Sequence, residues 1–205
     1  MQRGPFFPIV ARPCGEWQHR ESAVIAAKDF KPVLWLAGVM CVVQALNLLS
    51  GYSLNTYGLL PRSAHGLLGI ISAPFLHGSL WHLLGNLVPF IVLGTLVAKD
   101  GVGRFLAASG LIVLVGGLLV WLFGRGYYHV GASGWVFGLW VYVVARAWFH
   151  HSWANLLCAA AAMLLYGGLV YGFLPRYGVS FESHIAGAVA GFVAARVLLR
   201  KEEGV

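Results

Sequence analysis

Long apolar runs recur along the chain, and short segments between them carry most of the polar and charged residues. Six of these runs are candidate membrane spans, at residues 33–50, 80–98, 103–123, 132–149, 153–173 and 183–200. Each has about 18–21 residues, and at about 1.5 Å per residue a helix of that length crosses a hydrocarbon core of about 30 Å. The pattern therefore predicts an all-α polytopic membrane protein built as a bundle of six transmembrane helices.

The composition supports this prediction. The chain has 205 residues, of which 59% are hydrophobic and 10% are charged, whereas water-soluble domains carry about 25% charged residues. So few charges argue against a soluble globule, and so much apolar surface argues against disorder. The net charge of +7 could suggest nucleic acid in a soluble protein, but the basic residues here flank apolar runs. We therefore expect the lipid bilayer as a partner, and not nucleic acid.

The basic residues also predict how the spans are oriented. If the N-terminus is cytoplasmic, 11 of the 14 Lys and Arg residues fall in cytoplasmic segments, and the outer loops hold only Arg62, Arg125 and Arg176. The positive-inside rule then predicts that both termini are cytoplasmic. The chain divides into an N-terminal segment at 1–32, a membrane domain at 33–200 and a tail at 201–205. No cleavable signal peptide is apparent, so we expect the first span to act as both signal and anchor.

The connection between the first two spans is longer than a linker needs to be. Residues 51–79 include the apolar run GLLGIISAPFL, and about a dozen residues is too short to cross a bilayer. We therefore expect an outer loop that lies in the interface or is partly embedded in the membrane.

Polar side chains near the start of three spans are the candidates for chemistry. His82 and Asn86 lie near the start of the second span, Ser133 at the start of the fourth, and His184 at the start of the sixth. These three spans all run from the outside to the inside, so topology alone places the four side chains at a similar depth near the outer face. Polar residues at such positions are costly in a membrane and mark functional sites by default.

Small residues prepare the fourth and sixth spans for close packing. The fourth carries Gly134 and Gly138, and the sixth carries Gly187 and Gly191. Pairs of small residues at this spacing let helix backbones approach each other. If the two faces meet, Ser133 and the sixth-span histidine come together at the same end of the bundle.

Such a pair would support nucleophilic catalysis, because a neighbouring base can accept the proton of a serine hydroxyl. The only aspartates, Asp29 and Asp100, fall on the cytoplasmic side, and Glu182 is two residues from His184 and so on roughly the opposite helix face. No carboxylate is therefore placed to complete a catalytic triad, and the available side chains allow a Ser–His dyad. We expect the Ser133 hydroxyl and the His184 imidazole to be hydrogen-bonding neighbours.

Donors for a developing oxyanion are also available. His82 and Asn86 are four residues apart and share a helix face, and the Ser133 backbone N–H lies at a helix start. On a continuous helix His77 would point about 140° away from His82, so we interpret it as structural. Structural alternatives stay open at this stage: a helix cap for Ser133, an interfacial role for His184, and interhelical hydrogen bonds for the His82–Asn86 pair.

Metal binding is not favoured by the same residues. Three histidines, at 77, 82 and 184, could supply ligands. However, no HExxH motif is present, and no carboxylate or cysteine accompanies them. We therefore predict no metal and no other cofactor.

The motifs HGSLWHLLGN (77–86), GASG (131–134) and SHIAGAVAG (183–191), in this order, resemble those of the rhomboid family of intramembrane serine proteases. The resemblance covers residues 33–200. It implies that Ser133 is the nucleophile and His184 its base, and that His82 and Asn86 bind the oxyanion. It further implies that Gly131, the first glycine of GASG, lets the substrate backbone approach. His77 and Gly187 also match the family motifs, as structural residues.

Two positions depart from the family pattern. The family often has a Trp-Arg pair in the first loop, where this chain has Pro61 and Arg62. It also often has a tyrosine four residues after the nucleophile, packed on the histidine, where this chain has Phe137. A phenyl ring can still stack on an imidazole, but it lacks the hydroxyl.

The resemblance implies a serine endopeptidase that hydrolyses peptide bonds in or near the transmembrane segments of other membrane proteins. The compact six-span form is typical of a protein of the bacterial inner membrane. An alternative is a non-catalytic rhomboid-like protein that binds client transmembrane helices. A transporter or channel would favour polar residues at mid-membrane depth or inverted repeats, and neither is visible. No feature of the sequence indicates which oligomeric state the protein has.

Overall fold

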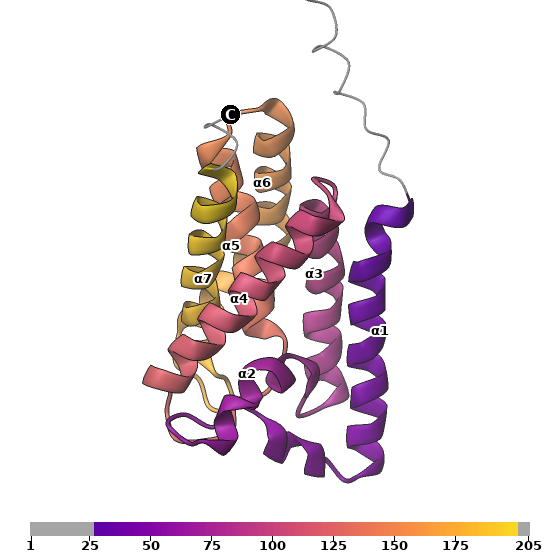
Figure 1. Ribbon diagram of the computed structural model, residues 1–205, viewed down its shortest axis with the longest axis vertical. Helices are drawn as coiled ribbons and strands as arrows, with labels where there is room; N and C mark the ends of the chain where they lie inside the picture. The colour runs from indigo at the N-terminus through magenta and orange to yellow at the C-terminus, as the bar shows by residue number, and fades with distance from the viewer. Residues whose placement is uncertain (1–26, 201–205) are drawn as a thin grey trace, which may run out of the picture.

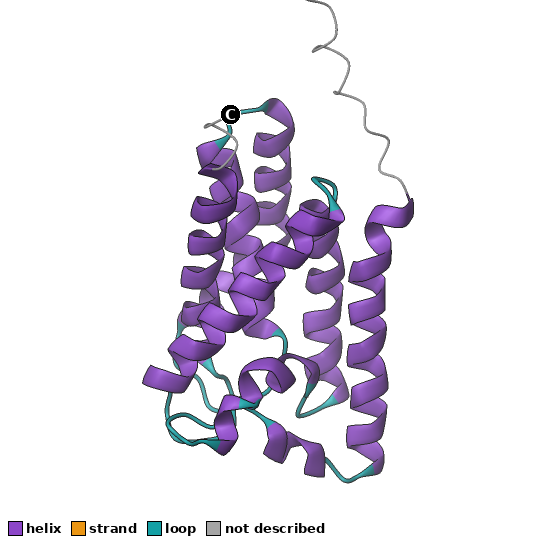
Figure 2. Cartoon of the chain, viewed as in Figure 1, coloured by secondary structure: helices purple, strands orange, loops and turns teal. Residues whose placement is uncertain are grey.

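A computed structural model describes residues 27–200, and the regular structure in that range is helical (Figure 2). The α-helices are α1 (Ala27–Leu49), α2 (Gly69–Ser72), α3 (Leu80–Ala98), α4 (Val102–Phe123), α5 (Ser133–Phe149), α6 (Trp153–Tyr166) and α7 (Phe181–Arg200). Short 3₁₀ helices are η1 (Ser53–Tyr57), η2 (His65–Leu67), η3 (Ala73–Phe75) and η4 (Gly167–Phe173). The described range contains no strand, so the all-α prediction is confirmed.

Successive long helices run in opposite directions, so the described chain begins and ends at the same end of the bundle (Figure 1). Helices α3, α5 and α7 all start at the other end, where the loop containing α2 also lies. Residues 1–26 and 201–205 lie outside the described range. The predicted cytoplasmic tail, and most of the predicted N-terminal segment 1–32, therefore stay predictions.

Five helical segments are long and apolar enough to cross a membrane: Phe30–Leu49, Leu80–Ala98, Val102–Phe123, Trp153–Phe173 and Phe181–Leu199. The first helix begins before the predicted span because helical backbone continues over the polar residues that precede the apolar run. The predicted fourth span is α5, which has 17 residues and is about 26 Å long. Helix α5 is shorter than the hydrocarbon core and is mostly buried among its neighbours.

The first loop folds into a compact helical layer instead of an extended linker. Its apolar part, His65–Phe75, is helical but too short to span, as expected from the sequence. Arg62 ties this layer to the end of α4 by donating from Nη1 to the carbonyl oxygens of Leu122 (3.2 Å) and Gly124 (2.8 Å). The Trp121 indole of α4 donates back to the Ser63 carbonyl at 2.9 Å.

Helices α5 and α7 touch along their glycines. A Cβ atom added to Gly187 would lie 1.9 Å from the carbonyl oxygen of Gly134, and one added to Gly191 would lie 2.1 Å from that of Gly138. No side chain fits at such a separation, so the two backbones are in direct contact. The predicted meeting of the two small-residue faces is confirmed, and it brings the starts of α5 and α7 together.

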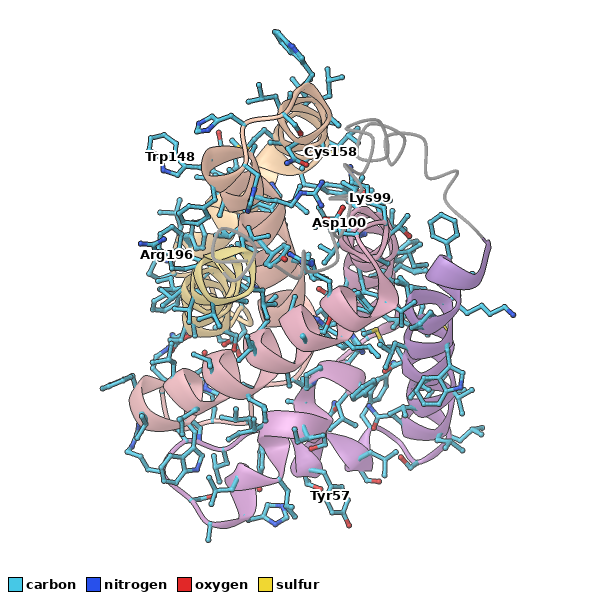
Figure 3. The ribbon with its side chains drawn as sticks, turned by 45° about the horizontal axis from the view of Figure 1, so that its top comes forward. Tyr57, Lys99, Asp100, Trp148, Cys158 and Arg196 are labelled. Atoms are coloured by element: carbon cyan, nitrogen blue, oxygen red, sulfur yellow. The ribbon has the colours of Figure 1, made fainter. Side chains whose placement is uncertain are left out.

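Polar side chains tie the helices together at the opposite end. The buried Arg146 guanidinium of α5 pairs with Asp100, in the turn before α4, and donates to Asn155 Oδ1 of α6 at 2.5 Å. In the same region Lys99 Nζ donates to Cys158 Sγ at 3.4 Å. Figure 3 shows Lys99, Asp100 and Cys158 at one end of the bundle and Tyr57 at the other.

The segment formed by α6 and η4 is the least enclosed of the five apolar spans. Only 6% of its apolar window is buried, against 44% for α7. It is held near its start by Asn155 and near its middle by the Trp140 indole, which donates to the Ala162 carbonyl at 3.2 Å. Its far end, η4, reaches the region where α3, α5 and α7 begin.

Candidate active site

A cavity of about 730 Å³ lies among the starts of α3, α5 and α7, between the loops that join the helices at that end. Five of the predicted site residues line it together: Ser133, His184, His82, Asn86 and Phe137. The structure therefore brings into one cavity the side chains that the sequence places at a similar depth.

Ser133 is the first residue of α5. Ala132 occupies the N-cap position, and no side chain caps the helix there, so the alternative of Ser133 as a capping hydroxyl does not hold. Gly131, two residues before Ser133, has φ +115°, a backbone conformation that residues with a side chain rarely adopt. Because α5 starts at Ser133, the Ser133 backbone N–H has no acceptor within the helix.

His184 is held in one orientation by a backbone carbonyl. The residue is 8% exposed, and its Nδ1 lies 2.7 Å from the carbonyl oxygen of Gly172 in η4. A carbonyl oxygen can only accept, so the neutral ring carries its proton on Nδ1 and a lone pair on Nε2. The Phe137 ring stacks on the imidazole, with centroids 4.2 Å apart and planes 2° from parallel. The stacking that a phenyl ring can still supply is therefore present.

The expected hydrogen bond between Ser133 and His184 is not formed in the described structure. Within residues 27–200, the hydrogen bond that His184 makes through its ring is the one from Nδ1 to Gly172. That contact uses the other ring nitrogen and leaves Nε2 available. Contacts between a nucleophile and its base are often loose until substrate is bound.

His82 and Asn86 form one wall with Gly131. A Cβ atom added to Gly131 would lie 2.6 Å from His82 Nε2 and 3.6 Å from Asn86 Nδ2, so glycine is required for this approach. Asn86 Nδ2 donates to the His82 carbonyl oxygen at 2.9 Å. The amide has a second N–H, which this bond leaves available.

His77 lies closer to this wall than the sequence argument allowed. Helix α3 begins only at Leu80, capped by Ser79, whose hydroxyl accepts from the His82 N–H at 3.0 Å, so helical spacing from His77 does not apply. The fully buried His77 ring packs edge-on to His82, 5.1 Å between centroids, and its Nε2 accepts the Ala132 N–H at 3.4 Å. Burial, reinforced by the neighbouring His82, lowers the pKa of His77 to about 4. A neutral His77 thus contacts the residue before Ser133, and its supporting role stays a prediction.

Sequence reasoning missed a second polar cluster, from which His129 and Ser180 line the cavity. The buried His129 lies between Ser180, whose Oγ is 2.6 Å from Nδ1, and the Arg125 carbonyl, 3.0 Å from Nε2. Because that carbonyl accepts, Nε2 carries the proton and Nδ1 accepts from the serine. Burial lowers the pKa of His129. The available signal was a histidine four residues before Ser133, in a short loop.

Glu182 belongs to this second cluster and is not hydrogen-bonded to His184. Its carboxylate pairs with the Arg125 guanidinium, and Arg125 Nη2 donates to Oε2 at 3.0 Å. The sequence argument placed this carboxylate away from His184, and the contacts agree. Within residues 27–200, no three His, Cys, Asp or Glu side chains gather in a way that could hold a metal ion.

A family model of the Rhomboid domain matches residues 64–201, more than half of the chain. The chain belongs to the rhomboid family. An uncharacterized protein of Mycobacterium tuberculosis is 34% identical over 180 residues, covering 83% of this chain and 75% of that protein. An uncharacterized protein of Mycobacterium leprae is 31% identical over 181 residues, covering 83% and 71%. RHOMBOID-like protein 4 of Arabidopsis thaliana is 32% identical over 138 residues, covering 63% of this chain and 34% of that protein.

Both departures from the rhomboid pattern have a structural account in this member. Arg62 still anchors the first loop, through the two α4 carbonyls described above, without a tryptophan before it. Phe137 still packs on His184, and it also meets the Phe173 ring of η4 edge-on, 5.1 Å between centroids.

Proposed function

We propose that this rhomboid is an intramembrane serine endopeptidase, which cleaves peptide bonds in or near the transmembrane segments of other membrane proteins. The observation that carries the proposal is the state of His184. Its Nδ1 is engaged by the Gly172 carbonyl, so Nε2 offers a lone pair to the cavity that Ser133 also lines.

The chemistry follows from this arrangement. Ser133 Oγ attacks the scissile carbonyl carbon while its proton passes to His184 Nε2. The tetrahedral intermediate collapses, the C–N bond breaks, and the protonated His184 donates to the leaving amine. A water then attacks the acyl-enzyme ester, with His184 again acting as base, and the product acid and free Ser133 result. The Gly172 carbonyl fills the orienting role that a carboxylate has in a triad.

Three donors are available for the oxyanion of the intermediate. They are the Ser133 backbone N–H, the second N–H of the Asn86 amide, and a ring nitrogen of His82. Asn86 and His82 line the same cavity as Ser133, and the close approach of Gly131 to both leaves room for a substrate backbone. Removing one such donor from a serine protease costs about 10²–10³ in kcat.

The length of α5 supports a site below the membrane surface. Arg146 lies in the last turn of α5, about 20 Å along the axis from Ser133 at 1.5 Å per residue. If Arg146 lies at one boundary of a hydrocarbon core of about 30 Å, Ser133 is about 10 Å beneath the other. A transmembrane substrate would have to unwind locally to present its carbonyl there, because helical backbone groups are bonded internally.

We further propose that the protein lies in a bacterial inner membrane with both termini in the cytoplasm. The apolar helices are those of an integral membrane protein. The end of the bundle where α1 begins and α7 ends carries Lys31, Lys99, Arg104, Arg146 and Arg196, whereas the described segments of the other end carry Arg62, Arg125 and Arg176. The active-site cavity would then open toward the extracytoplasmic side.

The test is cleavage of a tagged single-span substrate by purified protein in liposomes. Cleavage by the wild type and its loss in Ser133→Ala would support the protease. Labelling by a serine-reactive phosphonate, lost in both Ser133→Ala and His184→Ala, would support the dyad. A protein that retains substrate helices on pull-down but neither cleaves nor labels would instead be the non-catalytic binder.

A further inference from the structure

The active-site cavity has an uncompensated positive charge at its mouth. Arg176, an exposed residue in the segment between η4 and α7, lines it, and no Asp or Glu is among the lining residues. Within residues 27–200, no hydrogen bond or ion pair engages the Arg176 side chain. The three histidines of the cavity, His82, His129 and His184, can only add positive charge.

The carboxylate closest along the chain cannot neutralise Arg176. Glu182 is already held by Arg125, which pairs with it through Nε and donates to Oε2 through Nη2. The Tyr127 hydroxyl also lies 3.4 Å from Oε2. This carboxylate therefore has its partners on the Arg125 side of the loops, and the Arg176 guanidinium stays available.

The backbone adds to the same charge. Helices α3, α5 and α7 begin around the cavity, at Leu80, Ser133 and Phe181. The N-terminus of each helix carries a partial positive charge. A cavity that combines one fixed cation, three such helix ends and no carboxylate favours an anionic side chain over a neutral or cationic one.

We propose that Arg176 makes this rhomboid selective for substrates with an Asp or Glu on the extracytoplasmic side of the scissile bond, within its first few residues. The inference rests on the proposed protease function. A chain bound with its carbonyl at Ser133 occupies the cavity that Arg176 lines, and Arg176 belongs to the loop outside the start of α7. The substrate carboxylate would pair with the guanidinium, and a lysine there would be repelled.

A charge exchange tests the proposal. Two single-span substrates are compared, identical except for one residue close to the scissile bond on its extracytoplasmic side, which is Asp in one and Lys in the other. Each is cleaved in liposomes by the wild type, Arg176→Gln and Arg176→Glu. Arg196→Glu, an exposed site near the end of α7 and so at the opposite end of the bundle, is the control with the same change in net charge. Attraction of an exposed charge pair, or repulsion between like charges, changes an equilibrium constant by up to about fivefold. We therefore expect the wild type to cleave the Asp substrate with a kcat/KM about tenfold higher than that of the Lys substrate.

The ratio of kcat/KM for the Asp substrate to that for the Lys substrate should fall close to one in Arg176→Gln and below one in Arg176→Glu. In Arg196→Glu it should stay as in the wild type. The wild-type preference for Asp should also weaken as salt is raised, because exposed charges are screened. Ser133-dependent cleavage with the same Asp preference in Arg176→Glu would overturn the role of Arg176 and leave the protease standing. Absence of Ser133-dependent cleavage of either substrate would overturn the protease itself, and the specificity with it.

Discussion

Replacing Gly172 by alanine should impair His184, the proposed catalytic base, without disturbing the bundle. A Cβ atom at this position would lie 2.6 Å from Phe137 Cζ and 2.9 Å from His184 Nδ1. Contacts that short do not persist, so the phenyl ring, the imidazole or η4 itself must move. Relieving the 2.9 Å contact with Nδ1 requires the imidazole or η4 to move, and either movement lengthens or bends the 2.7 Å hydrogen bond that sets the tautomer of His184.

The size of the effect follows from the role of the base. General-base catalysis contributes about 10²–10⁴ in rate, and a base misplaced by tenths of an ångström loses part of that. We expect kcat/KM to fall by about 10- to 100-fold, or about 1.4–2.7 kcal/mol of transition-state stabilisation. The phosphonate labelling rate of Ser133 should fall by a similar factor, because it depends on the same base.

Gly167→Ala is the matched control, since it lies in the same 3₁₀ segment and an added Cβ there meets nothing within 4 Å. The assays are cleavage and labelling, with thermal unfolding to verify the fold. Nitrogen-15 spectra of labelled histidine add a direct readout, because the Nδ1–H form of His184 should lose population in Gly172→Ala alone. Activity within twofold of the wild type, in a folded Gly172→Ala protein with an unchanged spectrum, would refute the reasoning.

Two further predictions concern stability. The folded pKa of His77, about 4, lies below its ordinary value of 6.5, so this residue's contribution is fully present above pH 6.5 and is lost as the pH falls toward 4. The loss amounts to about 3 kcal/mol at most, and thermal unfolding measured between pH 7 and 4 should show a shallower decline in His77→Gln. In Gly187→Ala the added methyl meets the Gly134 carbonyl at 1.9 Å, so α5 and α7 must separate. We expect a loss of about 2 kcal/mol or more, whereas Gly110→Ala on α4, where a Cβ meets nothing within 4 Å, should unfold like the wild type; equal stability of the two variants would contradict the close packing.

Much of this arrangement could be predicted because it leaves a periodic signature. Glycines four residues apart on two spans predict a contact between the two helix backbones. The chain crosses the membrane twice between Ser133 and His184, which places both at the same end of the bundle. The Gly172 carbonyl leaves no such signature, since any residue supplies a backbone acceptor. The angle of about 140° between His77 and His82 does not apply, because it assumed a helix that begins only at Leu80. The contacts of His129 depend on loop conformation, which has no period to read.

The position of η4 has a consequence for how the membrane could act on catalysis. The carbonyl that accepts from His184 is carried by the span with the least protein around it, which is held near its start by Asn155 and near its middle by Trp140. Bilayer thickness, acyl-chain order or a docking helix would therefore bear on the reaction rate through this one segment. In the proposed protease, the lipid surroundings would set how often the general base is correctly aligned.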